Sequence, residues 1–286
     1  MRVALATTAA ARARDVDHAP LAAALARLGL AAEAPAWDDP DVDWQRYALV
    51  LPRSTWNYDD DLGAFLGWAE RVARCTRLEN RPATLRFSAD KRYLAELARA
   101  GLPVVPSAVT LPGERWSTPA EADYVLKPAI GTDGRGTRRF GPGGAAAAHA
   151  HAAALLARGL AVLTQPYLAA IDEDGESALV YFEGRFSHAV RKAPLLPAAG
   201  GAARELDVAT AVSARAPEAS ELALAARALA LVPGPAPLYA RVDLIRGACG
   251  APCVLELELV EPSLFFDFGP GSAERFAALI AARIAA

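Results

Sequence analysis

The sequence predicts an α/β protein, with an α+β arrangement in its C-terminal part, and two patterns support this fold class. Apolar strands and helices alternate over residues 1–85, which is typical of a parallel α/β unit. From residue 178 onward strands follow one another directly, which indicates antiparallel hairpins. The chain of 286 residues is also longer than a usual single domain, so we expect two or three lobes that share a cleft.

Residues 1–85 are predicted to form a first lobe that presents substrate to the rest of the molecule. Its apolar runs and leucine spacings indicate two buried strands and two helices. In parallel sheets, ligands bind beyond the carboxyl ends of the strands. The polar segment 53–58 lies at such an end, directly after the second strand. We expect strands at 2–7 and 47–51 and helices at 20–28 and 62–73.

Residues 86–164 and 165–286 are predicted to form a central and a C-terminal lobe. The central lobe carries a glycine-rich loop at 131–136, and a hairpin follows early in the C-terminal lobe. A stretch rich in Ala and Gly, 194–216, is predicted to be a mobile loop. Further helices are expected at 89–100, 143–160, 221–231 and 272–286, and further strands at 104–111, 124–126, 161–163, 179–183, 185–191, 238–245 and 254–259.

Charge and hydropathy exclude several kinds of partner. The chain has 30 basic and 33 acidic residues, a net charge of −3, so it lacks the basic excess that attracts nucleic acid. No apolar run reaches the roughly 18 residues of a membrane span. The first ten residues also lack the pattern of a secretory signal, so we expect a cytoplasmic protein. A homodimer is left open, and the four scattered histidines do not predict histidine catalysis.

Two lysines flank the glycine-rich loop, whose glycines are Gly131, Gly134 and Gly136. Glycines let backbone N–H groups close on phosphate oxygens, although alone they also fit a plain flexible turn. Lys127 ends an apolar strand, where its charge would be buried unless an anion met it. Lys91 lies near the start of a predicted helix, where it could equally be solvated. Together the lysines and the loop suit a clamp for a triphosphate.

Two strands near the C-terminus carry a cluster of charged residues. Arg241 and Asp243 alternate on one strand, and Glu256 and Glu258 alternate on the next, so each pair points to one side. If the turn between the strands pairs them, three carboxylates converge on one face. Such carboxylates repel one another unless a divalent cation binds them, and oxygen ligands beside phosphates favour Mg²⁺. A solvated acidic face is the alternative.

Three further features could complete a nucleotide site. The segment 165–168 ends a strand with exposed backbone and a flat aromatic ring, which would suit adenine. Glu176 could accept both ribose hydroxyls, and Arg191 adds positive charge that could face phosphates. Each feature also fits a hinge, a turn or a solvated strand end. The adenine segment consists of Gln165, Pro166, Tyr167 and Leu168.

The segment after the second strand supplies candidates for substrate binding. Arg53 with two neighbouring hydroxyls can grip a carboxylate, and Glu261 from the C-terminal lobe could meet an amine. The alternative is that Trp56 and Tyr58 only pack the interface between lobes. The substrate-binding candidates are Arg53, Ser54, Thr55, Trp56, Asn57 and Glu261.

The order of these parts resembles the ATP-grasp superfamily over nearly the whole chain. The resemblance rests on a small α/β lobe, Lys127-Pro128, the glycine loop, the Gln-Pro-Tyr-Leu hinge, and Arg-x-Asp followed by Glu-x-Glu. The spacing between Asp243 and Glu256 closely resembles that of D-alanine–D-alanine ligases, which usually carry Asn in place of Glu258. Other segments resemble a glutathione-synthetase-like subgroup, among them Asp90-Lys-Arg-Tyr-Leu94 and Glu258-Leu-Val-Glu-Pro-Ser263.

The resemblance implies ATP and Mg²⁺ as cofactors, with two metal ions. Lys91 and Lys127 would hold the ATP phosphates under the glycine loop, and Gln165–Leu168 and Glu176 would hold adenine and ribose. Arg241 would stabilise the oxyanion formed during attack, and Lys127 and Arg191 would share in catalysis by offsetting phosphate charge. The metal ligands would be Asp243, Glu256 and Glu258.

The resemblance further implies a ligase that forms a C–N bond on a small amino-acid-like substrate. The family phosphorylates a carboxylate or a related carbonyl oxygen, and an amine then displaces phosphate. The subgroup includes the cyclo-ligase that closes O-ureido-D-serine to D-cycloserine, which is the leading specific candidate. The alternative is an intermolecular carboxylate–amine ligase, peptide or glutathione-like. A noncatalytic nucleotide-binding regulator is disfavoured, because both lysines and the carboxylate cluster are present.

Overall fold

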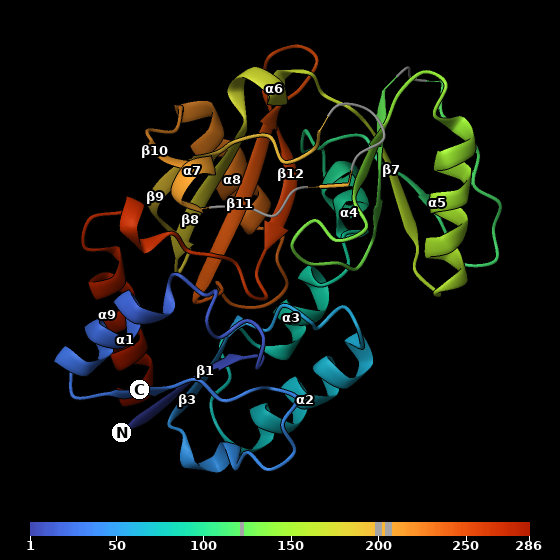
Figure 1. Cartoon of the computed structure of the whole chain (residues 1–286). Helices are drawn as coiled ribbons and strands as arrows, with labels where there is room; N and C mark the ends of the chain where they lie inside the picture. Colours follow the sequence, from blue (N-terminus) through green and yellow to red (C-terminus); the bar gives the residue numbers. More distant parts are fainter. Residues whose placement is uncertain (121–122, 198–201, 204–207) are drawn as a thin grey trace.

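The structure, a computed structural model of the chain, describes residues 1–120, 123–197, 202–203 and 208–286 (Figure 1). Strands of the described residues form three sheets, with helices packed against them. The sheets belong to successive parts of the chain, in the order parallel, antiparallel, antiparallel. The predicted α/β fold class is confirmed.

The first sheet is parallel, in the order β2-β1-β3. The predicted strand 2–7 is confirmed, whereas the second strand begins and ends later than predicted, so Arg53 and Ser54 belong to β3 itself. A short strand, β2, was not predicted, because three residues are too few to show an alternation of apolar and polar side chains. The elements are β1 (Arg2–Thr7), α1 (His18–Arg27), β2 (Ala31–Glu33), η1 (Trp44–Arg46), β3 (Leu49–Ser54), α2 (Leu62–Cys75) and α3 (Pro82–Ser88).

The second sheet is antiparallel, in the order β4-β7-β5-β6, and α5 covers one of its faces (Figure 1). Antiparallel pairing of Lys127 with Leu163 and of Pro128 with Val162 puts the end of β5 beside the start of β7. The glycine loop connects β5 to β6. The elements are β4 (Ala108–Thr110), β5 (Tyr124–Pro128), β6 (Arg138–Phe140), α5 (Ala145–Ala157) and β7 (Val162–Pro166).

The third sheet is antiparallel, in the order β10-β9-β8-β11-β12. Its predicted hairpins are both present, and the turn after β11 is closed by a hydrogen bond from Gly247 N to Ala251 O of 2.9 Å. The elements are α6 (Ala170–Asp174), β8 (Glu176–Phe182), β9 (Arg185–Lys192), α7 (Val208–Ala211), β10 (Val212–Arg215), α8 (Ala219–Leu229), β11 (Tyr239–Arg246), β12 (Pro252–Glu258), η2 (Phe266–Phe268) and α9 (Ser272–Ala285).

Two predictions about local structure were wrong. The helix predicted over 89–100 begins only at Tyr93, as α4 (Tyr93–Arg99), because Lys91 N donates to Ala129 O at 2.8 Å instead of entering a helix. The loop predicted over 194–216 contains α7 and β10, since the edge of β9 was available for pairing. Residues 198–201 and 204–207 of that loop lie outside the described part of the chain.

Helices that follow one sheet in sequence pack against another. The side chains of α4 lie in a core with β8, β11, β12 and α8, and α9 returns to pack on α1 of the first lobe (Figure 1). The pairing between α1 and α9 places the end of the described chain beside its beginning. The division into lobes at 1–85, 86–164 and 165–286 stays a proposal.

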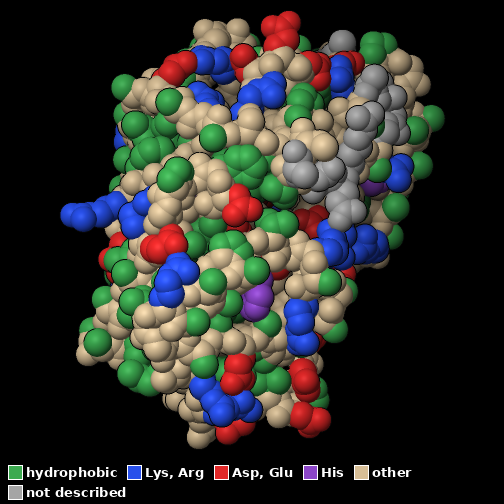
Figure 2. Space-filling model, turned by 60° about the vertical axis from the view of Figure 1, so that its left-hand side comes forward, with side chains coloured by type: hydrophobic (Ala, Val, Ile, Leu, Met, Phe, Trp, Pro, Cys, Tyr) green, Lys and Arg blue, Asp and Glu red, His purple; other side chains and the backbone are tan. Residues whose placement is uncertain are grey.

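The surface mixes charges of both signs. On the face shown in Figure 2, acidic and basic side chains lie interspersed, in keeping with the net charge of −3. Within the described residues, no helix has the length and apolar character needed to cross a membrane.

Candidate active site

A pocket of about 230 Å³ lies where the first lobe, the second sheet and the third sheet meet. Its floor is formed by β11 and β12, and the glycine loop and the segment after β3, which contact each other, also line it. The predicted site residues that line it are Trp56, Lys91, Lys127, Gly131, Gly134, Gln165, Pro166, Tyr167, Leu168, Glu176, Arg241, Asp243, Glu256, Glu258 and Glu261.

Two lysines from the central lobe reach the pocket and differ in their partners. Lys91 Nζ lies 2.9 Å from Glu256 Oε1 and donates to Gly131 O at 2.7 Å. Burial alone would lower the pKa of Lys91, but the charge of Glu256 outweighs it and raises the pKa. Lys127 is buried and, among the described residues, makes no ion pair or hydrogen bond. Burial, together with the charge of Lys91, lowers the pKa of Lys127.

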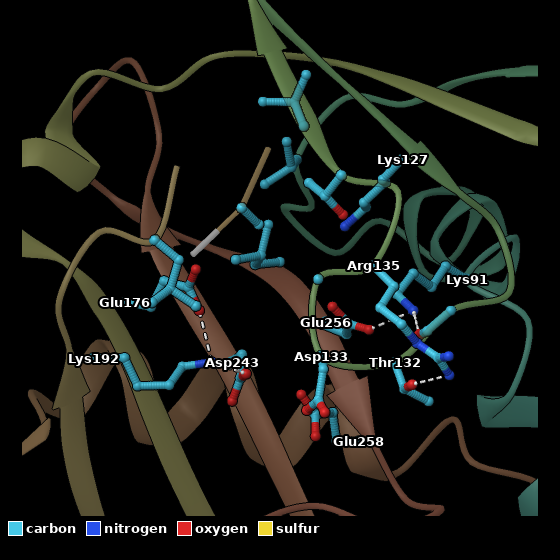
Figure 3. Close-up of a pocket in the computed structure, with 18 of the residues that line it drawn as sticks. Lys91, Lys127, Thr132, Asp133, Arg135, Glu176, Lys192, Asp243, Glu256 and Glu258 are labelled. Atoms are coloured by element: carbon cyan, nitrogen blue, oxygen red, sulfur yellow. Dashed lines mark hydrogen bonds and ion pairs between the residues drawn. The ribbon is translucent and has the colours of Figure 1, made fainter. Parts of the chain in front are cut away.

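A third lysine, Lys192, enters the pocket from the opposite side. Its Nζ lies 2.6 Å from Asp243 Oδ2 and 2.7 Å from Glu176 Oε2. Burial opposes its charge, yet these carboxylates raise the pKa of Lys192 above the ordinary value. Figure 3 shows Lys192 on one side of the pocket and Lys91 and Lys127 on the other, with the carboxylates between them.

The structure places Arg191 outside the pocket lining. Neighbouring residues of a strand point to opposite faces, and β8 pairs with β9 so that Glu176 lies opposite Lys192. Arg191 instead donates to the carbonyl oxygens of Glu173 and Asp174, both at 2.6 Å, at the end of α6. Arg191 was predicted to face the phosphates, but a bulge between Val180 and Tyr181 shifts the register by one residue and puts Lys192 opposite Glu176 instead.

The carboxylates converge as predicted, because β11 and β12 pair with Arg241 opposite Glu258 and Asp243 opposite Glu256. Arg241 Nε lies 2.8 Å from Asp243 Oδ1, and its Nη2 forms an ion pair with Glu258. Burial favours the neutral acid, but Arg241 and Lys192 lower the pKa of Asp243 to about 2. Burial raises the pKa of Glu258 to about 7, with the repulsion of Asp243 and Glu256 opposing Arg241.

The carboxylates suit a divalent cation that is shared with phosphates. Within the described residues, no three His, Cys, Asp or Glu side chains are arranged to hold a metal ion by themselves. Mg²⁺ normally takes one or two carboxylates and completes its coordination with waters and phosphate oxygens. Burial raises the pKa values of Glu258 and Glu261, and repulsion between neighbouring carboxylates raises them further. A bound cation would relieve that repulsion.

The end of the pocket at β7 is more apolar. Gln165 Nε2 donates to Ser107 Oγ at 2.8 Å, and the ring of Tyr167 lies 3.4 Å from the guanidinium carbon of Arg139. Side chains of Val105, Val125, Leu168, Ile171, Ile245 and Leu255 line this end. Such an apolar slot with a few polar groups suits a flat heterocycle.

Most of the predicted substrate segment is structural. Arg53 is 2% exposed and pairs with Asp17 at 3.3 Å, so its charge is held inside the first lobe and not in the pocket. Ser54 Oγ shares a hydrogen bond of 2.7 Å with Thr7 Oγ1, and Thr55 is fully buried. Asn57 accepts from Trp37 Nε1 at 2.6 Å. None of these four residues lines the pocket. Arg53 and Ser54 are buried because β3 extends further than predicted, and Asn57 is held by Trp37.

Three residues, Trp56, Tyr58 and Glu261, line the side of the pocket that faces the first lobe. Trp56 Nε1 donates to the carbonyl oxygen of Glu261 at 3.3 Å, which joins the two lobes. Tyr58 was named only as a residue that could pack the interface between lobes. It lines the pocket, and its ring packs on Phe65. Burial, reinforced by the negative charge of Glu258, raises the pKa of the Glu261 carboxyl well above its usual range.

Solved structures show the class of protein that this arrangement defines. A D-alanine–D-alanine ligase from Bacillus anthracis superimposes with a TM-score of 0.68 at 14% identity, over 99% of this chain and 96% of that chain. A RimK domain ATP-grasp protein from Sphaerobacter thermophilus gives a TM-score of 0.66 at 21% identity, over the full length of both chains. The fold is therefore that of the ATP-grasp ligases.

Closer similarity identifies the family. The crystal structure of D-cycloserine synthetase DcsG matches with a TM-score of 0.93 and 37% identity, over 99% of this chain and 100% of that chain. Cycloserine biosynthesis protein DcsG from Streptomyces lavendulae is 38% identical, over 99% of this chain and 98% of its own length. The family described as D-cycloserine synthetase DcsG, N-terminal domain, matches residues 3–80. The chain belongs to the DcsG family of ATP-grasp enzymes, and the prediction of an ATP-dependent C–N ligase is confirmed.

Proposed function

We propose that this protein closes O-ureido-D-serine to D-cycloserine at the expense of ATP, with two Mg²⁺ ions in the pocket. The observation that carries the proposal is the similarity to DcsG over nearly the full length of both chains, together with a pocket whose charged residues match those expected of the family. D-cycloserine synthesis belongs to the relative by name, and its transfer to this chain is the proposal.

Lys91, Lys127 and Lys192 would bind the phosphates of ATP. Lys127 has no ion-pair partner among the described residues, so a buried positive charge there favours an anion. Lys91 and Lys192 are already paired with carboxylates, and phosphates would join these pairs from the open side of the pocket. The apolar end at Tyr167 would hold adenine, and Glu176 would accept the ribose hydroxyls once Lys192 turns to phosphate.

The acidic residues would hold the metal ions and the substrate. Asp243, Glu256 and Glu258 would bind Mg²⁺, which, when present, neutralises charge that develops on the transferred phosphoryl group. Arg241 holds Asp243 and Glu258 in place through short ion pairs and would stabilise the oxyanion during attack. Glu261 lines the same pocket and would contact the amino group of the substrate.

The proposed reaction joins two groups of one small molecule. Transfer of the γ-phosphoryl group to the substrate carboxylate gives an acyl phosphate and ADP. The nitrogen bonded to oxygen in the same substrate then forms the C–N bond, and the C–O bond to phosphate breaks. Water then hydrolyses the bond between the ring nitrogen and the carbamoyl carbon, which places a proton on the ring nitrogen, releases CO2 and NH3 and leaves D-cycloserine. Trp56 and Tyr58 would exclude bulk water from the acyl phosphate.

The test measures ADP and phosphate release with single amino-acid derivatives and then with pairs of a carboxylate and an amine. We expect ADP release with O-ureido-D-serine alone and no further stimulation by a second amine. Release that requires a pair of substrates would favour the intermolecular ligase instead. Release that depends on no substrate at all would contradict both ligase proposals.

A further inference from the structure

We propose that Asp59 and Arg135 are positioning residues that latch the glycine loop to the first lobe, so that phosphates and substrate are enclosed together. The inference rests on the proposed function, because it concerns the closing of the same pocket. It goes beyond that function by assigning a role to two charged residues that contact neither the metal-ligand candidates nor the lysines described above.

The contacts between loop and first lobe are numerous. Arg135 forms an ion pair with Asp59, and its Nη1 lies 3.4 Å from Asp60 Oδ1. Arg135 Nη2 also donates to Trp56 O at 2.8 Å and to Thr132 Oγ1 at 2.9 Å. The loop is therefore tied to the backbone of Trp56, the residue that forms the first-lobe wall of the pocket.

A second residue of the loop, Thr132, reaches the same place. Its hydroxyl donates to Trp56 O at 3.0 Å and lies 3.3 Å from Asp59 Oδ1. Thr132 is 6% exposed, so the loop is seated against the first lobe and not merely near it. Figure 3 shows Thr132 and Arg135 side by side on the loop above the acidic floor.

The charges across this contact are complementary in both directions. The loop contributes Arg135 to the acidic pair of the first lobe, and it contributes Asp133 to Arg14 of the first lobe, with 3.7 Å between Arg14 Nη2 and Asp133 Oδ2. One basic and one acidic residue of a short loop meet two acidic residues and one basic residue of the first lobe. Such an arrangement fixes the register of the loop as well as holding it, since a shifted loop would bring like charges together.

The latch is strong enough to position the loop and weak enough to release it. The side chain of Arg135 is 45% exposed, and that of Asp59 is 11% exposed. Partly exposed ion pairs contribute little to stability, so nucleotide can enter when the pair opens. The loop also covers Lys91, whose Nζ donates to Gly131 O at 2.7 Å, so opening at Arg135 exposes the phosphate end of the pocket.

Loss of the latch should uncouple ATP use from ring closure. An open loop would admit water to the phosphorylated intermediate, and hydrolysis would return the substrate carboxylate and phosphate without forming a C–N bond. For Asp59→Asn we expect about a fivefold rise in ADP released per product, in line with the modest strength of such pairs. Asp59→Glu should restore coupling in large part, because it restores the charge.

Arg135→Gln should give the same uncoupling through a change at an exposed side chain, which keeps the test open if Asp59→Asn fails to fold. Glu70→Gln is the matched control, because Glu70 of the first lobe forms an ion pair with Arg86 and neither residue lines the pocket. The control should keep wild-type coupling. Wild-type coupling in both Asp59→Asn and Arg135→Gln would overturn the latch.

Limited proteolysis tests the latch without any ligase activity. Trypsin cuts after arginine, and Arg135 lies in the loop itself, so cleavage between Arg135 and Gly136 reports an open loop. We expect Asp59→Asn to be cut there faster than wild type and Glu70→Gln to be cut at the wild-type rate. Equal rates in all three proteins would overturn the latch. Faster cutting in Asp59→Asn, with no ADP released in the presence of any amino-acid derivative, would sustain the latch and refute the proposed function.

Discussion

At the scale of single residues, the three lysines of the pocket differ in whether a carboxylate already pairs with their charge. Lys91 and Lys192 have carboxylate partners, whereas Lys127 has none among the described residues. Its burial costs free energy that an anion would recover. ATP phosphates would therefore gain most from Lys127, while they compete with carboxylates for the other two lysines.

This difference predicts proton uptake when nucleotide binds. Burial lowers the pKa of Lys127, and phosphates would raise it, so the site should take up protons and its affinity should fall as pH rises through the lowered pKa. Because the pKa of Lys127 is lowered in the folded protein, Lys127 binds more protons in the unfolded chain. Its contribution to the free energy of unfolding therefore rises with pH between the lowered pKa and the ordinary value. Calorimetry in buffers of different ionisation enthalpy measures the uptake. Lys127→Arg, which stays charged, should lose it, and equal uptake in both proteins would refute the assignment.

The metal assignment predicts a separate effect on turnover and on binding. Glu256→Gln should lower turnover about a hundredfold or more, because a metal ion supplies several kcal/mol of charge stabilisation. Nucleotide binding should change little, since the substitution frees Lys91 from its ion pair. Steady-state rates and a titration with a nonhydrolysable ATP analogue measure the two effects. Glu274→Gln, which breaks an exposed pair with Arg27, serves as the control, and unchanged turnover in Glu256→Gln would refute the assignment.

Some of the site residues could be predicted from the sequence because their geometry is local. Period two placed Arg241 with Asp243, and Glu256 with Glu258, on one side of each strand, whereas the bulge that sets Asp243 opposite Glu256 left no signal in the sequence. Arg53 and Arg191 could not be placed in the same way, because each satisfies its charge through a partner distant in sequence. Asp17 pairs with Arg53, and the carbonyl groups at the end of α6 accept from Arg191.

At the scale of elements, the turn from α6 into β8 sets the position of two pocket residues. Gly175 ends α6 with φ of 69°, and a Cβ there would overlap the carbonyl oxygen of Lys192. Glu176 follows directly, and β8 pairs with β9 so that Glu176 faces Lys192. Only glycine allows the two strands to approach so closely at this point.

Replacement of Gly175 by alanine should therefore damage both stability and the site. We expect a loss of about 3 kcal/mol or more, because strain from positive φ adds to overlap with backbone. Gly159→Ala is the matched control: Gly159 has φ of 77°, but nothing lies within 4 Å of its Cβ position, so about 1 kcal/mol is expected. Urea unfolding measures both. Equal losses in the two variants would contradict the close approach at Gly175.

Element boundaries were predicted well where the period is long and poorly where a distant contact decides. The spacing of apolar residues predicted α2 and α8 to within a few residues. It could not predict the break at Lys91, because the hydrogen bond to Ala129 O that replaces a helical one comes from the end of β5. Strand β10 could not be predicted either. It has only four residues, and no local sequence pattern indicates that it pairs with β9.

At the scale of the whole molecule, the lobes are joined around the pocket by buried polar contacts. Asp17 of the first lobe accepts backbone N–H bonds from Phe265 and Phe266 at 3.3 and 3.1 Å. Asn80 donates to the carbonyl oxygens of Tyr239 and Leu259 at 2.9 and 2.8 Å. These contacts hold the segment that contains Glu261 against the first lobe. The lining of the pocket therefore combines residues from the parts of the chain that form all three sheets. Sequence patterns predicted most strands of the three sheets, whereas the contacts by which the sheets dock left no local signal.

The central claim is that one molecule of substrate is closed into a ring at the cost of one ATP. Its most direct test incubates the protein with O-ureido-D-serine, ATP and Mg²⁺ and measures D-cycloserine by mass spectrometry alongside ADP. We predict D-cycloserine and ADP in equal amounts, and neither when ATP is left out. ADP without D-cycloserine, or D-cycloserine without ATP, would contradict the account.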